Sequence, residues 1–157
     1  MLMTIRKILT FDEPQLHKKC EKVKTIDNHI LEIIEDLKDT LYNSDGVGLA
    51  APQIGELHRI VLIDMRDGSE PILILNPKII SQSGTVTGYE GCLSYPGYTG
   101  EVVRPKAVTV FGNDVNGKKV SYKATGMLAR CFCHELDHLD GIVYTDRTKF
   151  VYRDDEE

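Results

Sequence analysis

One stretch decides the fold, residues 125–141, with the sequence TGMLARCFCHELDHLDG. Its apolar residues recur at helical spacing, and Gly141 is the kind of residue that follows a last helical turn. At ~100° per residue, Cys131, His134 and His138 lie within about 60° of one another around the helix axis. The larger apolar residues fall on a separate, wider face. The stretch therefore predicts a helix over about 125–140 that packs on a core and presents a polar stripe to a site.

The stripe contains an H-E-x-x-H motif, formed by His134, Glu135 and His138. Histidines four apart on a helix project from one face about 40° apart, which is close enough to hold one metal ion. Glu135 follows the first histidine, where a carboxylate can act as a base toward a metal-bound water. The motif predicts a metal-dependent hydrolase. Two ordinary histidines on a partly buried helix are the alternative that these five residues alone leave open.

A metal that activates water usually has a third protein ligand. In the metzincin pattern, H-E-x-x-H-x-x-G-x-x-H, that ligand is a histidine, and Tyr144 stands in its place here. Downstream, the only suitably spaced carboxylates are those of Glu156 and Glu157, in an acidic tail. The ligand is therefore sought upstream. Cys92 is the best candidate there, because a thiolate is a strong ligand for a soft or borderline metal.

The rest of the sequence predicts a second helix, a loop and several strands. Apolar residues at helical spacing between Ile26 and Leu41 predict an amphipathic helix near the N-terminus. Three glycines and a proline within residues 46–55 predict a loop with some extended backbone. The Asn116-Gly117 pair predicts a hairpin. Segments rich in β-branched and apolar residues predict strands over residues 59–65, 71–80, 106–112 and 118–124.

These elements predict an α+β fold. We expect antiparallel or mixed β-sheets packed around a central helix in the C-terminal half that carries H-E-x-x-H, with the amphipathic helix near the N-terminus. A length of 157 residues without repeats or linker-like segments predicts a single domain over residues 1–157. Residues 148–157, which end in four acidic residues, are expected to form a frayed tail.

Composition and charge exclude several kinds of partner. The apolar runs are far shorter than the ~20 residues of a membrane-spanning helix, and the start of the chain lacks a signal-peptide pattern. We therefore expect a cytoplasmic protein without a membrane partner. A net charge of −5 without a basic run disfavours direct sequence-specific binding to nucleic acid. The four cysteines, Cys20, Cys92, Cys131 and Cys133, are expected to be reduced thiols.

Three segments of the sequence resemble the motifs of the peptide deformylases. Residues 46–53, GVGLAAPQ, resemble the first motif, GxGxAAxQ. Residues 90–94, EGCLS, match the second, and residues 134–138, HELDH, match the third, HExxH. The motifs occur in the family's order at compatible distances, and the resemblance extends from Ile5 to about Arg147. The first two motifs are not separated by a long insertion, which is similar to the compact bacterial form.

The resemblance implies an active site as well as a fold. It implies Cys92, His134 and His138 as the three protein ligands of one divalent metal, with water in the fourth position. Fe(II) is the expected native metal, and zinc, nickel or cobalt can occupy such a site. The implied substrate is the N-formyl group on the initiator methionine of nascent polypeptides. Its hydrolysis yields formate and a free amine.

Residues around the ligands are expected to act on the substrate. The resemblance implies Glu135 as general base and acid, with the Gln53 side chain and the backbone N–H of Leu93 as donors to the formyl oxygen. Gly46 and Gly48 would let the loop approach an extended peptide closely. Together, the residues expected to bind the peptide and its methionine side chain are Gly46, Val47, Gly48, Leu49, Tyr95, Met127 and Cys131.

Two other functions are compatible with parts of this pattern. A small zinc peptidase that cuts internal bonds would use Glu135 as well, but with a third ligand other than Cys92 and a cleft open at both ends. A non-catalytic member of the family would bind formyl-peptides without turnover, although such members generally lose a motif residue. The resemblance also suggests a transient ribosome association. Some members have a basic C-terminal helix proposed for that contact, and this chain has an acidic tail instead.

Overall fold

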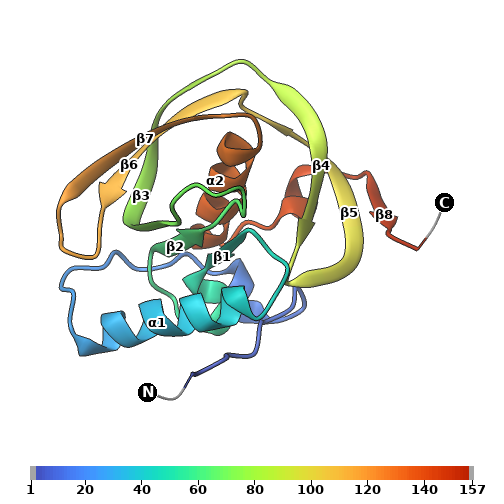
Figure 1. The fold of residues 1–157 in the computed structure, drawn as a ribbon. Coiled ribbons are helices and arrows are strands. Elements are labelled where there is room, and N and C mark those ends of the chain that lie inside the picture. The colour runs from blue at the N-terminus through green and yellow to red at the C-terminus, as the bar shows by residue number, and fades with distance from the viewer. Residues whose placement is uncertain (1–2, 156–157) are drawn as a thin grey trace.

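The computed structural model describes residues 3–155. These residues form α-helices, β-strands and short 3₁₀ helices (Figure 1). The helices are α1 (Asn28–Tyr42) and α2 (Gly126–Leu139), and the 3₁₀ helices are η1 (Pro14–His17), η2 (Ala51–Ile54) and η3 (Tyr144–Arg147). The strands are β1 (Gly48–Ala50), β2 (Ile60–Ile63), β3 (Ile72–Ser83), β4 (Val86–Cys92), β5 (Tyr95–Arg104), β6 (Ala107–Asn113), β7 (Lys119–Thr125) and β8 (Val151–Arg153).

The strands form two antiparallel sheets that flank α2. One sheet has the strand order β1-β2-β3-β6-β7, and the other has the order β4-β5-β8. Neighbouring strands are antiparallel in both sheets. Figure 1 shows α2 in the middle of the molecule, with β3, β6 and β7 on one side and β4 and β5 on the other. The chain therefore has the predicted α+β fold, and its sheets are antiparallel rather than mixed.

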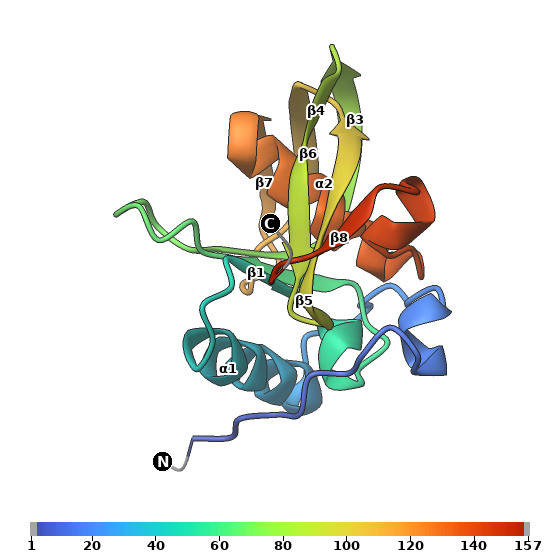
Figure 2. The same ribbon diagram turned by 90° about the vertical axis from the view of Figure 1, so that its right-hand side faces the viewer.

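β2 is buried on both faces because a helix covers each face. Its successive side chains point to opposite sides of the sheet. Val61 and Ile63 belong to the core that contains Phe132 of α2, whereas Ile60 and Leu62 belong to the core that contains the apolar face of α1. Figure 2 shows α1 at the end of the molecule opposite the tips of β3 and β4. Burial on both faces explains why the strand is an unbroken apolar run.

α1 occupies the position of the amphipathic helix predicted near the N-terminus. The side chain of Asp27 accepts a hydrogen bond from the backbone N–H of Ile30 at 3.0 Å and so caps the first turn. The apolar residues of the helix are buried on one face, which contacts β1, β2 and η2. The helix therefore supports the segment that carries the first motif. Neither α-helix of residues 3–155 is long and apolar enough to cross a membrane.

The four predicted strands correspond to β2, β3, β6 and β7. The predicted hairpin joins β6 to β7, and Gly117 in its turn has a φ of +81°. The helix predicted over about 125–140 is α2, and Gly141 follows it with a φ of +75°. The sequence analysis did not predict β4 and β5, because glycines interrupt the apolar pattern of both strands.

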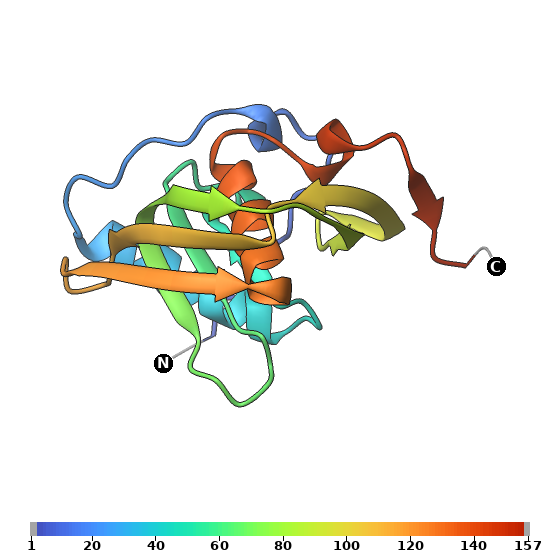
Figure 3. The same ribbon diagram turned by 90° about the horizontal axis from the view of Figure 1, so that it is seen from above.

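The expectation of a frayed tail over residues 148–157 is wrong for its central part. Residues 151–153 form β8, in which Tyr152 pairs with Thr99 of β5. Figure 3 shows β8 at the outer edge of the molecule. The acidic residues at the end of the chain suggested a solvated tail and gave no indication of a strand. Strand pairing, however, uses backbone groups and does not depend on side-chain charges. Glu156 and Glu157 lie outside the described residues.

Candidate active site

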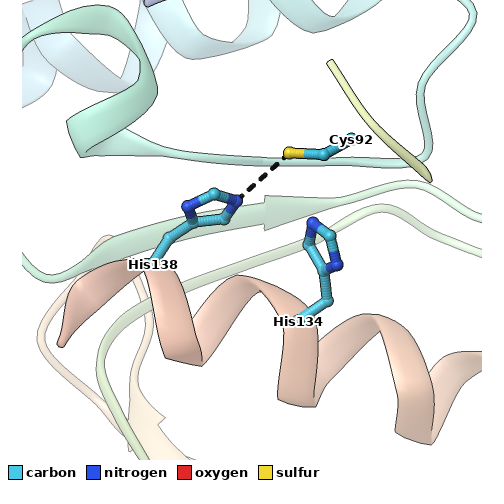
Figure 4. A group of neighbouring side chains, drawn as sticks. All are labelled: Cys92, His134 and His138. Atoms are coloured by element: carbon cyan, nitrogen blue, oxygen red, sulfur yellow. Dashed lines mark hydrogen bonds between the residues drawn. The ribbon is translucent and has the colours of Figure 1, made fainter. Parts of the chain in front are cut away.

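Three potential metal ligands converge at the centre of the molecule. Cys92 lies at the end of β4, and His134 and His138 lie one turn apart on α2. Their ligand atoms all lie within 4.8 Å of one another, and Cys92 Sγ is 3.4 Å from Nε2 of His138 (Figure 4). Both histidines are buried, and Cys92 is partly buried. The fold thus brings the expected upstream cysteine next to the histidine pair.

Glu90, two residues before Cys92, orients one of the histidines. Its Oε1 lies 2.8 Å from Nδ1 of His134, so Nδ1 donates to the carboxylate and Nε2 is left available as a ligand atom. The same carboxylate accepts two hydrogen bonds from Arg104 at 2.8 Å and one from Arg130 at 2.7 Å. Burial alone would raise the pKa of Glu90. The hydrogen bonds from Arg104 and His134 outweigh this effect, so the pKa lies well below its ordinary value and Glu90 is a buried anion.

The chemistry of the donor set fits a divalent transition metal. One thiolate and two imidazole nitrogens suit Fe(II), zinc, nickel and cobalt, and three protein ligands leave a position open for water or substrate. The contact between His134 and Glu90 is the carboxylate partner that ligand histidines typically have. Glu135 in this region also has a buried carboxylate oxygen without a hydrogen-bond partner among the residues that the structure describes. These residues therefore fit a catalytic metal rather than a closed structural site.

Glu135 has the surroundings of a general base and acid. Its side chain is buried, and its Oε1 has no hydrogen-bond partner among residues 3–155. Burial raises the pKa of its carboxyl to about 7. A carboxyl group with a pKa near the working pH can accept a proton and later return it.

Two glycines of the first motif make room for residues of the other two motifs. A Cβ on Gly48 would lie 2.6 Å from Oε2 of Glu135, and a Cβ on Gly46 would lie 2.7 Å from Cδ1 of Leu93. Cβ atoms essentially never approach other atoms so closely. The glycines therefore permit the three motifs to pack together. The sequence analysis had assigned them to the approach of substrate and did not foresee this role.

Gln53, in η2, holds the donor end of its amide group beside Cys92. Its Oε1 accepts a hydrogen bond from the backbone N–H of Ala50 at 2.9 Å. Because that N–H can only donate, it fixes which end of the amide faces the ligands. Nε2 consequently lies 3.6 Å from Cys92 Sγ and donates to Ser94 Oγ at 3.0 Å. Ser94 is fully buried, and the sequence analysis assigned it no role although it belongs to the second motif.

A cavity of about 530 Å³ adjoins the ligands, and Cys92, His134 and Glu135 line it. Cys131 on its wall is buried, whereas Met127 is 62% exposed, so the cavity extends from the interior to the surface. Six of the seven residues expected to bind substrate line this cavity, namely Gly46, Val47, Gly48, Tyr95, Met127 and Cys131.

The seventh residue, Leu49, was expected to line the pocket, and that expectation is wrong. Leu49 is fully buried in the core that contains the apolar face of α1. Successive residues of a strand point to opposite faces, so Leu49 of β1 points toward α1 while Gly48 and Ala50 face α2. The sequence analysis treated this segment as a loop and therefore lacked the alternation that separates its neighbours.

A chain of ion pairs extends from Glu90 toward the surface. Arg104 donates to Asp137 at 2.6 Å, and Arg147 of η3 donates to both oxygens of Asp137 at 2.5 and 2.8 Å. Asp137 lies between the two ligand histidines in sequence, but its carboxylate holds η3 and β5 against α2. The sequence analysis did not predict the pairs of Asp137 with Arg104 and Arg147, because these partners are distant in sequence. The network fixes the helix with the histidines relative to the sheet with Cys92.

Comparisons with known proteins agree with this arrangement of motifs. The family model described as polypeptide deformylase matches residues 5–154. The chain belongs to the polypeptide deformylase family. A peptide deformylase from Alkaliphilus metalliredigens (strain QYMF) is 48% identical to it over 145 residues, which cover 92% of this chain and 97% of that protein. As a member of this family, the chain is an enzyme and a hydrolase.

Solved structures of the family have the same fold. The crystal structure of a peptide deformylase from Legionella pneumophila matches with a TM-score of 0.90 and 43% identity, and the match covers 93% of this chain and 87% of that one. The peptide deformylase from Ehrlichia chaffeensis in complex with actinonin matches with a TM-score of 0.87 and 37% identity, over 94% of this chain and 90% of that one. The resemblance in the three motifs therefore extends to nearly the whole chain.

Proposed function

We propose that the chain removes the N-formyl group from the initiator formyl-methionine of nascent polypeptides and releases formate. One observation carries the proposal. Cys92, His134 and Glu135 line one cavity, and Oε1 of the buried Glu135 carboxyl, which has no hydrogen-bond partner among residues 3–155, belongs to the side chain next to a cluster of three potential ligands. Hydrolysis of an amide can use a metal that activates water together with a neighbouring base that takes the proton of that water. Membership of the family supports the choice of substrate.

In this proposal Cys92, His134 and His138 hold one divalent ion. Fe(II) is the native metal, and zinc, nickel or cobalt can replace it. When bound, the ion lowers the pKa of its water and polarises the formyl carbonyl. Glu90 keeps the proton of His134 on Nδ1, so Nε2 remains a ligand atom.

The remaining chemistry is assigned to residues of the chain. Glu135 takes a proton from the attacking water, whose oxygen bonds to the formyl carbon. Gln53 Nε2 and the backbone N–H of Leu93 donate to the formyl oxygen as it becomes negative. Glu135 then returns the proton to the methionine nitrogen as the carbon–nitrogen bond breaks. The products are formate and a free amino group.

The cavity would take the methionine side chain and the first part of the peptide. Its apolar wall includes Val47, Tyr95, Met127 and Cys131. The backbone of Gly46 to Gly48 would pair with the peptide as a neighbouring strand does. Residues beyond the methionine would then extend toward the surface end of the cavity.

The proposed substrate also determines where the protein works. Formyl-methionyl chains emerge from ribosomes, so we place the enzyme in the cytoplasm as a single domain that meets its substrate there. Its contact with the ribosome would be transient. The proposal includes no membrane partner and no sequence-specific binding to nucleic acid.

Formate release from formyl-Met-Ala-Ser by the anaerobically purified Fe(II) protein tests the proposal. Glu135→Ala should retain its metal and lose nearly all activity, because a general base contributes a factor of about 10² to 10⁴. Glu135→Gln is the matched control, since it keeps the volume beside Gly48 but cannot take the proton. Full activity in Glu135→Ala, or none in the Fe(II) wild type, would refute the mechanism.

The two rival functions predict different results. A zinc peptidase with another third ligand would keep its metal in Cys92→Ser, whereas our proposal expects that variant to lose most of its metal affinity and activity. A non-catalytic member of the family would bind formyl-Met-Ala-Ser without releasing formate. Metal content and formate are therefore measured on the same samples.

A further inference from the structure

A second cluster of potential ligands lies away from the active site, on the opposite side of β1 and β2 near the start of α1. It comprises His29 in the first turn of α1, Glu56 just after η2, and His58 just before β2. One ligand atom from each residue lies within 4.8 Å of the other two. His29 is exposed, and the other two residues are partly buried. Two imidazoles and one carboxylate are a donor set that binds zinc and similar metals.

The spacing of the donors is close to what one ion requires. Donors at roughly 2.1 Å from a tetrahedral zinc lie about 3.4 Å from one another. His29 Nε2 is 3.7 Å from Glu56 Oε2. The rings of His29 and His58 lie edge to face, with centroids 6.0 Å apart and planes at 76°. The three ligand atoms lie within 4.8 Å of one another, so they must approach by at most about 1.4 Å, and the side chain of His29 is exposed and can rotate toward the other two.

Arg6 orients the carboxylate of this cluster. Its Nη2 lies 3.5 Å from Glu56 Oε1, which leaves Oε2 on the side of His29. Arg6 is itself held by Asp36 at 2.9 Å and by the backbone carbonyl of Ile54 at 3.0 Å. Arg6 is closer to Asp36 than to Glu56, so its positive charge is only partly directed at Glu56. The carboxylate of Glu56 therefore remains negative enough to attract a cation. A partner that orients a ligand from behind is typical of metal sites.

The backbone positions of the three residues are fixed by the fold. The backbone N–H of Glu56 donates to Ala51 at 3.1 Å. His58 forms a bridge with Glu21, and the N–H of Glu21 donates to Leu57 at 2.9 Å. A surface cavity of about 510 Å³, lined by both His29 and His58, gives solvent access to the cluster. The backbone that carries Glu56 and His58 is therefore fixed, and an ion has a path by which it can enter.

We propose that His29, Glu56 and His58 form a second metal site, which binds zinc or a similar borderline divalent ion. The ion links the first turn of α1 to the segment between η2 and β2. Glu56 in this segment lies three residues after Gln53. Water completes the coordination, since the cluster is open to solvent. The site contains no thiolate, so its ligands distinguish it from the cluster at Cys92.

Zinc stoichiometry tests this proposal on the full chain. After dialysis against buffered free zinc, the wild type should bind two ions per chain, and His29→Ala and His58→Ala should each bind one. Loss of a ligand should weaken the second site by more than the roughly 10- to 100-fold that follows loss of an orienting partner. His17→Ala is the matched control, since His17 is the chain's only histidine outside both clusters, and it should still bind two.

Cobalt spectra and thermal unfolding separate the two sites. The ion at Cys92 should give a thiolate-to-cobalt band in the near ultraviolet, and the second equivalent should add visible absorption without increasing that band. The second equivalent should also raise the unfolding temperature of the wild type but not of His58→Ala. Binding of the first cobalt equivalent at Cys92, seen as the thiolate band, shows that each variant is folded.

Two results would overturn the proposal. One is a wild type that binds a single zinc ion. The other is a second zinc ion that persists in both His29→Ala and His58→Ala or disappears in His17→Ala. Formate release is measured separately and bears only on the deformylase proposal, because no residue of the second cluster belongs to the active site.

Discussion

Gly48→Ala should damage the active site without removing any polar group from it. The new Cβ would lie 2.6 Å from Oε2 of Glu135, whereas ordinary contacts begin at 3.4 Å, so the two must separate by about 0.8 Å. β1 cannot retreat, because it pairs with β2 and its residues Leu49 and Ala50 are fully buried. The carboxylate of Glu135 must therefore move.

A displacement of about 1 Å at a reacting group can cost on the order of 100-fold in rate. We expect kcat for formyl-Met-Ala-Ser to fall by about that factor while the metal content stays the same. Overpacking should also lower the free energy of unfolding by about 1–3 kcal/mol. The measurements are formate release, metal analysis and urea unfolding.

Gly91→Ala is the matched control for this substitution. Gly91 belongs to the second motif, and its added Cβ would meet only the carbonyl oxygen of Tyr98, at an ordinary 3.5 Å. This variant should keep its stability. If Gly48→Ala retained wild-type kcat and stability, the glycine would not be needed for the packing of Glu135, and our reasoning would be refuted.

Two further predictions concern buried ionisable groups. Glu90→Gln should lower the free energy of unfolding by about 3–5 kcal/mol in urea unfolding, since it removes the anion that pairs with the buried Arg130 and leaves the buried Arg104 with Asp137 alone; an unchanged midpoint would contradict this. Burial raises the pKa of Cys20 to about 12, so Cys20 should resist iodoacetamide at pH 8.5 in the folded protein and react once the chain is unfolded. Mass spectrometry that finds equal modification in both states would exclude the expected protection.

The features that the sequence analysis predicted are those encoded by neighbouring residues. The apolar repeat between Ile26 and Leu41 predicted α1, and the Asn116-Gly117 pair predicted the hairpin of β6 and β7. β4 and β5 were missed because their glycines break the apolar alternation from which strands are inferred. β8 was missed because it is held by backbone pairing with β5.

In the candidate site, too, the sequence predicted the features that depend on neighbouring residues. The sequence by itself determined that His134 and His138 share one face of a helix with Glu135 beside them, because four residues span about one helical turn. It also pointed to Cys92 as an upstream ligand, through the chemistry of thiolates and the motif around it.

Only the tertiary structure decided what surrounds these residues. It turned Leu49 away from the cavity, placed Glu135 against Gly48, and assembled the partners of Glu90 from residues up to 44 positions away. Such contacts depend on how strands and helices pack across the whole chain. Local spacing in the sequence does not encode these contacts, and so only the folded molecule shows the hydrogen-bonded network around the candidate ligands.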